Sequence, residues 1–94
     1  MLKGLRILKN TTYNDKRGFY WTTWKKGNFK KIKFNHDKFS ISKKNVLRGF
    51  HCDFKSWKLV TCVFGKVFLA IVNVNKNDRD YLKSKTFILK HQKP

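Results

Sequence analysis

Four basic side chains, those of Arg48, His51, Lys55 and Lys58, lie within one apolar and aromatic stretch of the chain, NVLRGFHCDFKSWKL at residues 45–59. Three of them, Arg48, His51 and Lys58, could together do chemistry. A neutral imidazole removes protons efficiently near neutral pH, an ammonium stabilises negative charge that develops on an oxygen, and a guanidinium binds oxygens with its planar fork. In an enzyme the three side chains would supply a base, an electrophile and an anion clamp. In a nucleic-acid binder they would face phosphates instead.

From His51 onward, four residues are spaced along the sequence much as the metal-ligand motif of cupin barrels is spaced. Metal-binding cupins have two His, a Glu and a Gly along this motif, whereas this chain has His51, Asp53, Lys58 and Gly65. A fixed ammonium at the position of a carboxylate ligand opposes a divalent cation at short range. The motif therefore predicts a cupin barrel whose site works without a metal ion, and we expect no cofactor.

Three motifs give a more specific resemblance. In chain order they are DKRGFYWT at residues 15–22, VLRGFH at 46–51 and KLVTCVFGKV at 58–67. They resemble the motifs of the dTDP-4-dehydrorhamnose 3,5-epimerase family, in the same order and at similar spacing. The similarity covers most of the chain, from about Thr12 to Tyr81.

The resemblance implies an all-β, cupin-type jelly-roll barrel that acts on a nucleotide-linked 4-keto-6-deoxy sugar. Epimerisation removes the proton from a carbon beside the ketone and returns one to the other face. By resemblance, His51 is the base, Lys58 stabilises the enolate oxygen, and Arg48 faces the keto group and the diphosphate. Strict alternation along a strand would place Arg48 and His51 on opposite faces, so we expect a β-bulge at Gly49 that directs both into the barrel.

Recognition of the nucleotide departs from the dTDP pattern of the family. Arg17 falls on the arginine that contacts the diphosphate, and Tyr20 falls on an aromatic residue near the nucleotide, although sheet packing is an equal alternative for Tyr20. The family Glu two positions later is Thr22 in this chain. The Gln and Asn that bind thymine fall on His36 and Lys38. The sequence therefore does not support thymine selectivity, and guanine is an alternative.

A branch of the family that acts on GDP-linked 4-keto-6-deoxy-heptoses resembles the chain in three further segments. These are HDKF at residues 36–39, NVLRG at 45–49 and YLK at 81–83. A dTDP-hexose and a GDP-heptose both stay open as the substrate, and both belong to the biosynthesis of surface polysaccharide sugars.

Two catalytic parts of the family have no match here. The Tyr that acts as general acid and the carboxylate that orients the catalytic His lie downstream of the matched segment, and KTFILKHQKP at residues 85–94 contains neither. We expect a single partial domain over residues 1–94, the N-terminal half to two-thirds of a barrel. Truncation, decay of the gene, and a half barrel completed by another chain all stay open as its origin. Because an incomplete barrel leaves an open sheet edge, we expect a homodimer or larger homo-oligomer. Whether the chain is active alone stays open.

Apolar residues alternate along most of the chain with the period of two that is typical of β-strands. A spacing of about ten residues between turn signals indicates an all-β sandwich or barrel. The clearest expected hairpin covers residues 57–74 and turns at Phe64–Lys66. The other turns are expected at 26–28, 43–45 and 75–78. The expected strands are 18–24, 30–42, 46–53, 57–64, 67–74 and 85–90.

The charge of the chain supports a second interpretation. Lys and Arg number 23 against 5 Asp and Glu, which gives a net charge of +18. Such an excess favours contact with a polyanion, although the cations are spread from Lys3 to Lys93 and also fit a simple bias in residue usage. The alternative function is a small basic β-barrel that binds RNA or single-stranded DNA through cations and aromatics such as those of residues 20–34.

The cysteines and the apolar segments indicate the compartment. Cys52 and Cys62 form no CxxC pair and would lie too far apart in the expected hairpin for a disulfide, which favours a reducing compartment, the cytoplasm. The N-terminal MLKGLRILK lacks the apolar region of a signal peptide. The most apolar stretch, residues 59–72, is short and contains Lys66, so we expect no membrane span.

Overall fold

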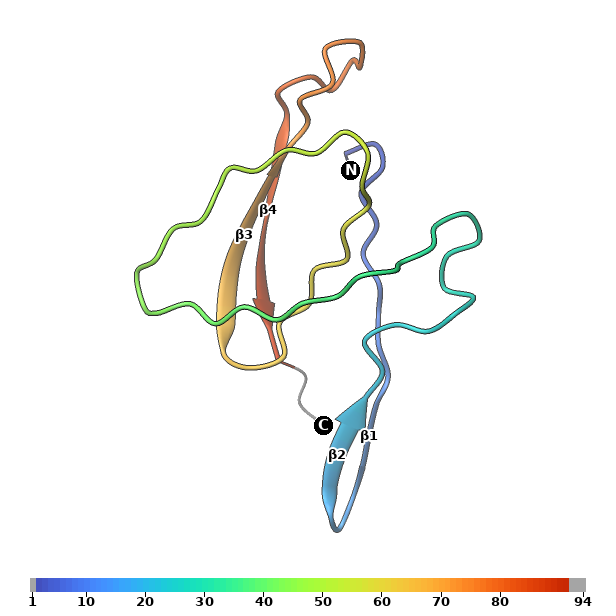
Figure 1. Cartoon of the computed structure of the whole chain (residues 1–94). Coiled ribbons are helices and arrows are strands. Elements are labelled where there is room, and N and C mark those ends of the chain that lie inside the picture. Colours follow the sequence, from blue (N-terminus) through green and yellow to red (C-terminus); the bar gives the residue numbers. More distant parts are fainter. Residues whose placement is uncertain (1, 92–94) are drawn as a thin grey trace. The chain divides into compact units, whose positions relative to one another are not determined.

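The computed structural model describes residues 2–91 of the chain. Over this range it contains two antiparallel hairpins and no helix, which confirms the all-β expectation. The chain divides into two units. One unit runs to Trp24, resumes at Val60 and holds both hairpins, whose strands are labelled in Figure 1. The other unit is Lys25–Leu59.

The first hairpin joins β1 (Thr12–Asp15) to β2 (Gly18–Trp21). Thr12 pairs with Trp21 and Asp15 pairs with Gly18, so only two residues, Lys16 and Arg17, form the turn. The Asp15 side chain accepts the Arg17 backbone N–H at 2.8 Å, which is the local bond that makes Asp a turn residue. This hairpin confirms part of the strand expected at 18–24 and adds β1, which the alternation did not predict.

The second hairpin joins β3 (Lys66–Val72) to β4 (Ser84–Lys90) in a register that runs from Lys66–Lys90 to Val72–Ser84. Along each strand the side chains alternate between the two faces. Leu69 and Phe87 are opposite each other and half-buried, whereas Phe68 and Ile88 are opposite each other on the other face and stay 69% and 61% exposed. The ladder therefore has one partly covered face and one face on which the apolar pair Phe68 and Ile88 is open to solvent.

The connection Asn73–Lys83 closes this hairpin through bonds of its own. The Asn73 backbone N–H donates to the Lys83 carbonyl at 2.9 Å, and the Leu82 N–H donates to the Asn73 carbonyl at 2.7 Å, so the ladder continues past β3. Within the connection, the turn expected at 75–78 is confirmed, because the Asp78 N–H donates to the Asn75 carbonyl at 3.1 Å. Asn and Asp stabilise such turns because their side chains also bond the nearby backbone.

Three of the expected strands, 30–42, 46–53 and 57–64, are wrong, because the structure assigns no strand to these ranges. The expected hairpin at 57–74 is wrong for the same reason, since β3 takes β4 as its partner. Periodicity reports which residues fit a pleated surface, but a strand also requires a neighbour that pairs with its backbone groups. The turns expected at 26–28 and 43–45 do form, with Gly27 and Asn45 at φ of 101° and 65°.

Buried side chains are few in the described residues, and they lie in the unit that holds the hairpins. Leu2 and Cys62 are the buried apolar residues, each 9% exposed. The Cys62 thiol lies 3.4 Å from the Phe64 carbonyl oxygen, just before the point where the chain turns into β3 at Gly65. This arrangement is all-β, and the closure of a jelly-roll barrel remains an expectation from the resemblance.

Gly65 connects the buried Cys62 segment to the end of β4. The His91 backbone N–H donates to the Gly65 carbonyl at 3.3 Å, and the His91 ring stacks on Phe64 with centroids 6.1 Å apart. The Gly65 N–H lies 3.2 Å from His91 Nδ1, which accepts it in the neutral ring. Gly65 adopts φ +79°, a left-handed conformation that favours glycine.

We expect Gly65→Ala to lower the free energy of unfolding by about 1–2 kcal/mol, the cost of a left-handed L-residue. A Cβ at this position meets nothing within 4 Å, so backbone strain alone should account for the loss. Gly65→Asn is the matched control, because Asn tolerates the left-handed region better, and it should lose less. Urea unfolding of the three chains measures the difference, and equal losses for Ala and Asn would contradict this account.

Candidate functional site

Arg17 lies in the turn of the first hairpin and is held there by Asp15. Arg17 Nη2 and Nε donate to Asp15 Oδ2 at 2.6 and 3.2 Å, in addition to the backbone bond of the turn. The side chains are 89% and 50% exposed. The hydrogen bonds from the Arg17 side chain and backbone hold the pKa of Asp15 below its ordinary value, and the same contact raises the pKa of Arg17. The predicted diphosphate contact is therefore a fixed guanidinium at a hairpin tip.

Tyr20 lies on β2, opposite Tyr13 of β1. The two rings stack with centroids 5.4 Å apart and planes inclined by 25°. Tyr20 is 64% exposed, and the residues on either side of it, Phe19 and Trp21, stack with each other at 5.9 Å. Tyr20 thus takes part in cross-strand packing and at the same time presents an exposed ring. Both roles that the sequence allowed for this residue are compatible with the geometry.

Arg48 belongs to the unit Lys25–Leu59 and binds back across the turn at Asn45. Its Nε donates to the Ser42 hydroxyl at 2.9 Å and its Nη2 donates to the Ile41 carbonyl at 3.3 Å. Asn45 lies between the two segments at φ 65°, a conformation that Asn tolerates better than most residues. These two bonds use part of the five N–H donors of the guanidinium and fix its direction.

Gly49 separates Arg48 from His51. The expected β-bulge at Gly49 is wrong, because residues 46–53 form no strand that a bulge could interrupt. Gly49 instead adopts φ +113°, and a Cβ there would lie 3.5 Å from the His51 backbone nitrogen. Alternation between two faces therefore does not apply to Arg48 and His51, because the segment that holds them is not a strand. The His51 side chain is exposed.

Asp53 and Lys58 come after His51 in the same unit. Asp53 Oδ1 accepts the Lys55 backbone N–H at 2.8 Å, and its Oδ2 accepts the Ser56 hydroxyl at 2.7 Å. These two bonds, and to a smaller extent the charge of Lys58, lower the pKa of Asp53. Asp53 is therefore the anchor of a local turn rather than a ligand, and the positive charge of Lys58 acts within electrostatic range of it.

His36 and Lys38 lie in the same unit and are exposed. They follow a segment where Phe29 and Phe34 meet edge to face with ring centroids 5.2 Å apart. Of the residues that the sequence singled out, Arg17 and Tyr20 belong to the unit with the hairpins. The structure places the other five, His36, Lys38, Arg48, His51 and Lys58, in the unit Lys25–Leu59.

The sequence reasoning missed the role of Asp15. Its signal was present, because an Asp two residues before the turn residue Arg17 is typical of a side chain that caps a tight turn. Two further carboxylates also have local partners. Asp78 accepts the Asn73 side chain at 3.2 Å, and Asp80 pairs with Lys83 at 3.4 Å.

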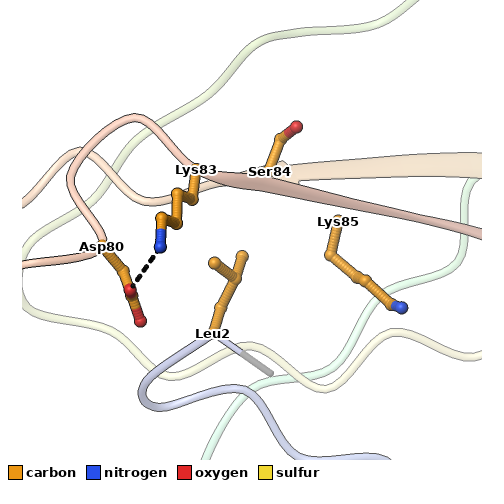
Figure 2. A pocket seen from close by; sticks show the side chains of 5 residues that line it. All are labelled: Leu2, Asp80, Lys83, Ser84 and Lys85. Atoms are coloured by element: carbon orange, nitrogen blue, oxygen red, sulfur yellow. Dashed lines mark ion pairs between the residues drawn. The ribbon is translucent and has the colours of Figure 1, made fainter.

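A pocket of about 290 Å³ lies in the unit with the hairpins, at the start of β4. Figure 2 shows its lining residues, Leu2, Asp80, Lys83, Ser84 and Lys85. The Lys83 ammonium points to the Asp80 carboxylate, so both charges are partly neutralised. None of the residues predicted for catalysis or binding lines this pocket.

Two other features are absent from residues 2–91. No three His, Cys, Asp or Glu side chains in this range are grouped as they would be around a metal ion. Helices long and apolar enough to cross a membrane are also absent from this part of the chain. Cys52 and Cys62 are free thiols, the first exposed and the second buried.

Comparison with known proteins identifies the family of this chain. The profile of the dTDP-4-dehydrorhamnose 3,5-epimerase family matches residues 1–94. The chain belongs to the dTDP-4-dehydrorhamnose 3,5-epimerase family. Within this family, the dTDP-4-dehydrorhamnose 3,5-epimerase of Salmonella typhimurium is 37% identical over 78 residues, which cover 74% of this chain and 43% of that protein.

Two further members of the epimerase family align with this chain over similar lengths. The dTDP-4-dehydrorhamnose 3,5-epimerase of Escherichia coli is 32% identical over 90 residues, and that of Methanothermobacter thermautotrophicus is 31% identical over 86 residues. These alignments cover 87% and 85% of this chain, and 49% and 46% of the relatives. The chain thus spans about half the length of these relatives. No solved structure matches it significantly.

The turn at Asp53 gives a prediction for this epimerase-family chain. Ser56→Ala should raise the pKa of Asp53, because the second largest cause of its depression is the Ser56 hydroxyl, and Lys58→Met should raise it less. Since the folded pKa lies below the ordinary 3.8, the stabilisation of the turn is present above that value and is lost as pH falls through the folded pKa. A carboxyl-carbon NMR titration measures the shifts, and a larger effect from Lys58→Met would contradict the assignment.

Proposed function

We propose that the chain is a nucleotide-sugar 3,5-epimerase-like protein that acts on a 4-keto-6-deoxy sugar joined to a nucleoside diphosphate. The observation that carries this proposal is the match to the epimerase family over residues 1–94, together with relatives that are named dTDP-4-dehydrorhamnose 3,5-epimerase. The substrate class includes a dTDP-hexose and a GDP-heptose, and the product belongs to the biosynthesis of surface polysaccharide sugars.

The proposed chemistry begins with proton removal by His51. The ketone makes the hydrogen on the neighbouring carbon acidic, and a neutral imidazole takes it near neutral pH. The electron pair moves to the keto oxygen and forms an enolate, whose negative charge the Lys58 ammonium stabilises. A proton then returns to the opposite face of the carbon and completes the inversion. No metal ion or cofactor takes part in these steps.

Arg48 is proposed to orient the sugar and the diphosphate. The bonds to Ser42 and Ile41 support this role, because they use Nε and Nη2 and fix the direction of a guanidinium that has five donors in all. A fork held in place loses less conformational freedom when it binds an oxygen pair.

The nucleotide is proposed to contact Arg17, Tyr20, His36 and Lys38. The exposed ring of Tyr20 supports stacking, and the exposed guanidinium of Arg17 supports contact with the diphosphate. His36 and Lys38 replace the thymine-binding pair of the family, so a guanine nucleotide is proposed beside thymine. This part of the proposal concerns specificity, and it can fail without affecting the roles of His51 and Lys58.

Solvent exchange tests the chemistry directly, because it requires proton removal alone and does not depend on the general acid. In D₂O, the chain should incorporate deuterium at C3 or C5 of a 4-keto-6-deoxy sugar linked to dTDP or GDP. His51→Asn should slow incorporation by at least about 100-fold, as expected for loss of a general base. Lys58→Ala should slow it by about 100- to 1,000-fold, as expected for loss of enolate stabilisation. Mass spectrometry and NMR measure the label.

Lys55→Ala is the matched control for Lys58→Ala. Lys55 is an exposed lysine of the same unit, and its contact with Asp53 uses the backbone N–H, so the turn should persist after the substitution. Exchange should therefore stay near the wild-type rate. An absence of exchange in a folded wild-type chain would overturn the proposed activity and favour polyanion binding by the basic surface.

We further propose that the chain forms a homodimer or larger homo-oligomer in the cytoplasm. The exposed apolar pair Phe68 and Ile88 on the second hairpin supports self-association, because covering it removes apolar surface from water. Each strand of that hairpin also pairs with a single neighbour within residues 2–91, which leaves further edges to pair.

Light scattering after size-exclusion chromatography should therefore give at least twice the chain mass of 11.3 kDa. Phe68→Lys should shift the population towards the monomer, because it adds a charge to the apolar face and leaves the backbone ladder intact. Lys85→Ala on the other face is the control and should not change the mass. A compact monomer at micromolar concentration would overturn the proposal of self-association.

A further inference from the structure

The ion pair at the tip of the first hairpin has a defined geometry. Asp15 Oδ1 accepts the Arg17 backbone N–H at 2.8 Å, and Asp15 Oδ2 accepts Nη2 at 2.6 Å and Nε at 3.2 Å. The carboxylate therefore lies along the side edge of the guanidinium. The terminal edge, made of Nη1 and the second N–H of Nη2, points away from it, and this is an edge that can bind two phosphate oxygens at once.

We propose that Asp15 is a positioning residue for nucleotide binding, which holds Arg17 so that its terminal guanidinium edge faces the diphosphate. This inference rests on the proposed function, which gives Arg17 its ligand. It goes beyond that function because it assigns a role to a residue that would not touch the substrate.

Because Asp15 and Arg17 are exposed, their ion pair can restrict the side chain of Arg17 before a ligand binds. Arg17 is 89% exposed, so without Asp15 its long side chain would sample many rotamers and lose that freedom on binding. Asp15 is ionised at neutral pH, since its pKa lies below the ordinary carboxyl value. The same charge repels a diphosphate, and this repulsion opposes the benefit of orientation. We expect orientation to prevail, because a bidentate contact depends on the direction of the fork.

The two oxygens of Asp15 allow its structural and positioning roles to be separated. Asn has a side-chain oxygen in the place of Oδ1, so Asp15→Asn keeps the acceptor for the Arg17 backbone N–H and preserves the turn. The substitution removes the charge that holds Nη2 and Nε. A change in binding by Asp15→Asn therefore reports on the side chain of Arg17 rather than on the hairpin.

The test is a double-mutant cycle on the full chain, with dTDP and GDP as probes in isothermal titration calorimetry. Asp15→Asn should weaken binding of the preferred diphosphate about two- to fivefold, the range expected for an exposed ion pair. In the Arg17→Lys background the same substitution should not weaken binding, because an ammonium has no fork to orient and only the repulsion between Asp15 and the diphosphate is removed. The nucleosides without the diphosphate should be insensitive to Asp15→Asn.

Asp80→Asn is the matched control variant. Asp80 also pairs with a cation, Lys83 at 3.4 Å, and its substitution changes the net charge by the same amount. If binding responds to total charge alone, both substitutions will have the same effect. If Asp15 acts through Arg17, binding will change only in Asp15→Asn. In NMR, the Nε–H group of Arg17 should become more mobile in Asp15→Asn. The backbone signals of β1 and β2 should not change.

The outcomes separate this inference from the proposed function. If the wild-type chain binds the diphosphate and Asp15→Asn binds it equally well or more tightly, the positioning role is overturned and the proposed function stays intact. The same loss in the Arg17→Lys background would also overturn it, since the effect would not pass through the guanidinium. A folded wild-type chain that binds neither diphosphate would overturn the proposed function, and the inference with it.

Discussion

The pairing of backbone groups between strands is the constraint on which this structure depends. Alternating apolar residues run through most of the chain, yet strands form only in two antiparallel pairs within the described residues. β3 and β4 pair along seven positions because the connection Asn73–Lys83 bonds across itself and continues their ladder. In Lys25–Leu59 the same kind of alternation has no such partner, and turns provide its local order. Candidate catalytic residues therefore lie on a segment shaped by turns.

Acidic side chains have a particular role in a chain with a net charge of +18. Of the five acids, Asp15 and Asp53 cap turns, Asp78 binds Asn73, and Asp80 pairs with Lys83. Each contact is local in sequence, so it forms without help from distant packing. Two of the turns carry or precede predicted site residues, Arg17 and Lys58. The few negative charges thus act at positions where they shape the backbone and orient cations, rather than as a general balance of charge.

The family and the local geometry both bear on the basic residues Arg48, His51 and Lys58 within residues 45–59. Membership of the epimerase family supports the proposal that this segment supplies a base, an electrophile and an anion clamp. The geometry adds how one of them is directed, because the Arg48 guanidinium is held by Ser42 and Ile41. Polyanion binding explains the charge but not the ordered spacing of these residues.

The sequence by itself determined the family, the all-β class and most turn positions, because these depend on residue types and short spacings. Asn45, Gly27 and the Asn75 turn formed where Gly and Asn allow unusual backbone angles or local side-chain bonds. Strand pairing was decided only in three dimensions, since β3 could meet either the preceding or the following segment and alternation does not distinguish them. The contact between Asp15 and Arg17 was also decided there, because the direction of a guanidinium depends on which carboxylate oxygen the hairpin brings to it.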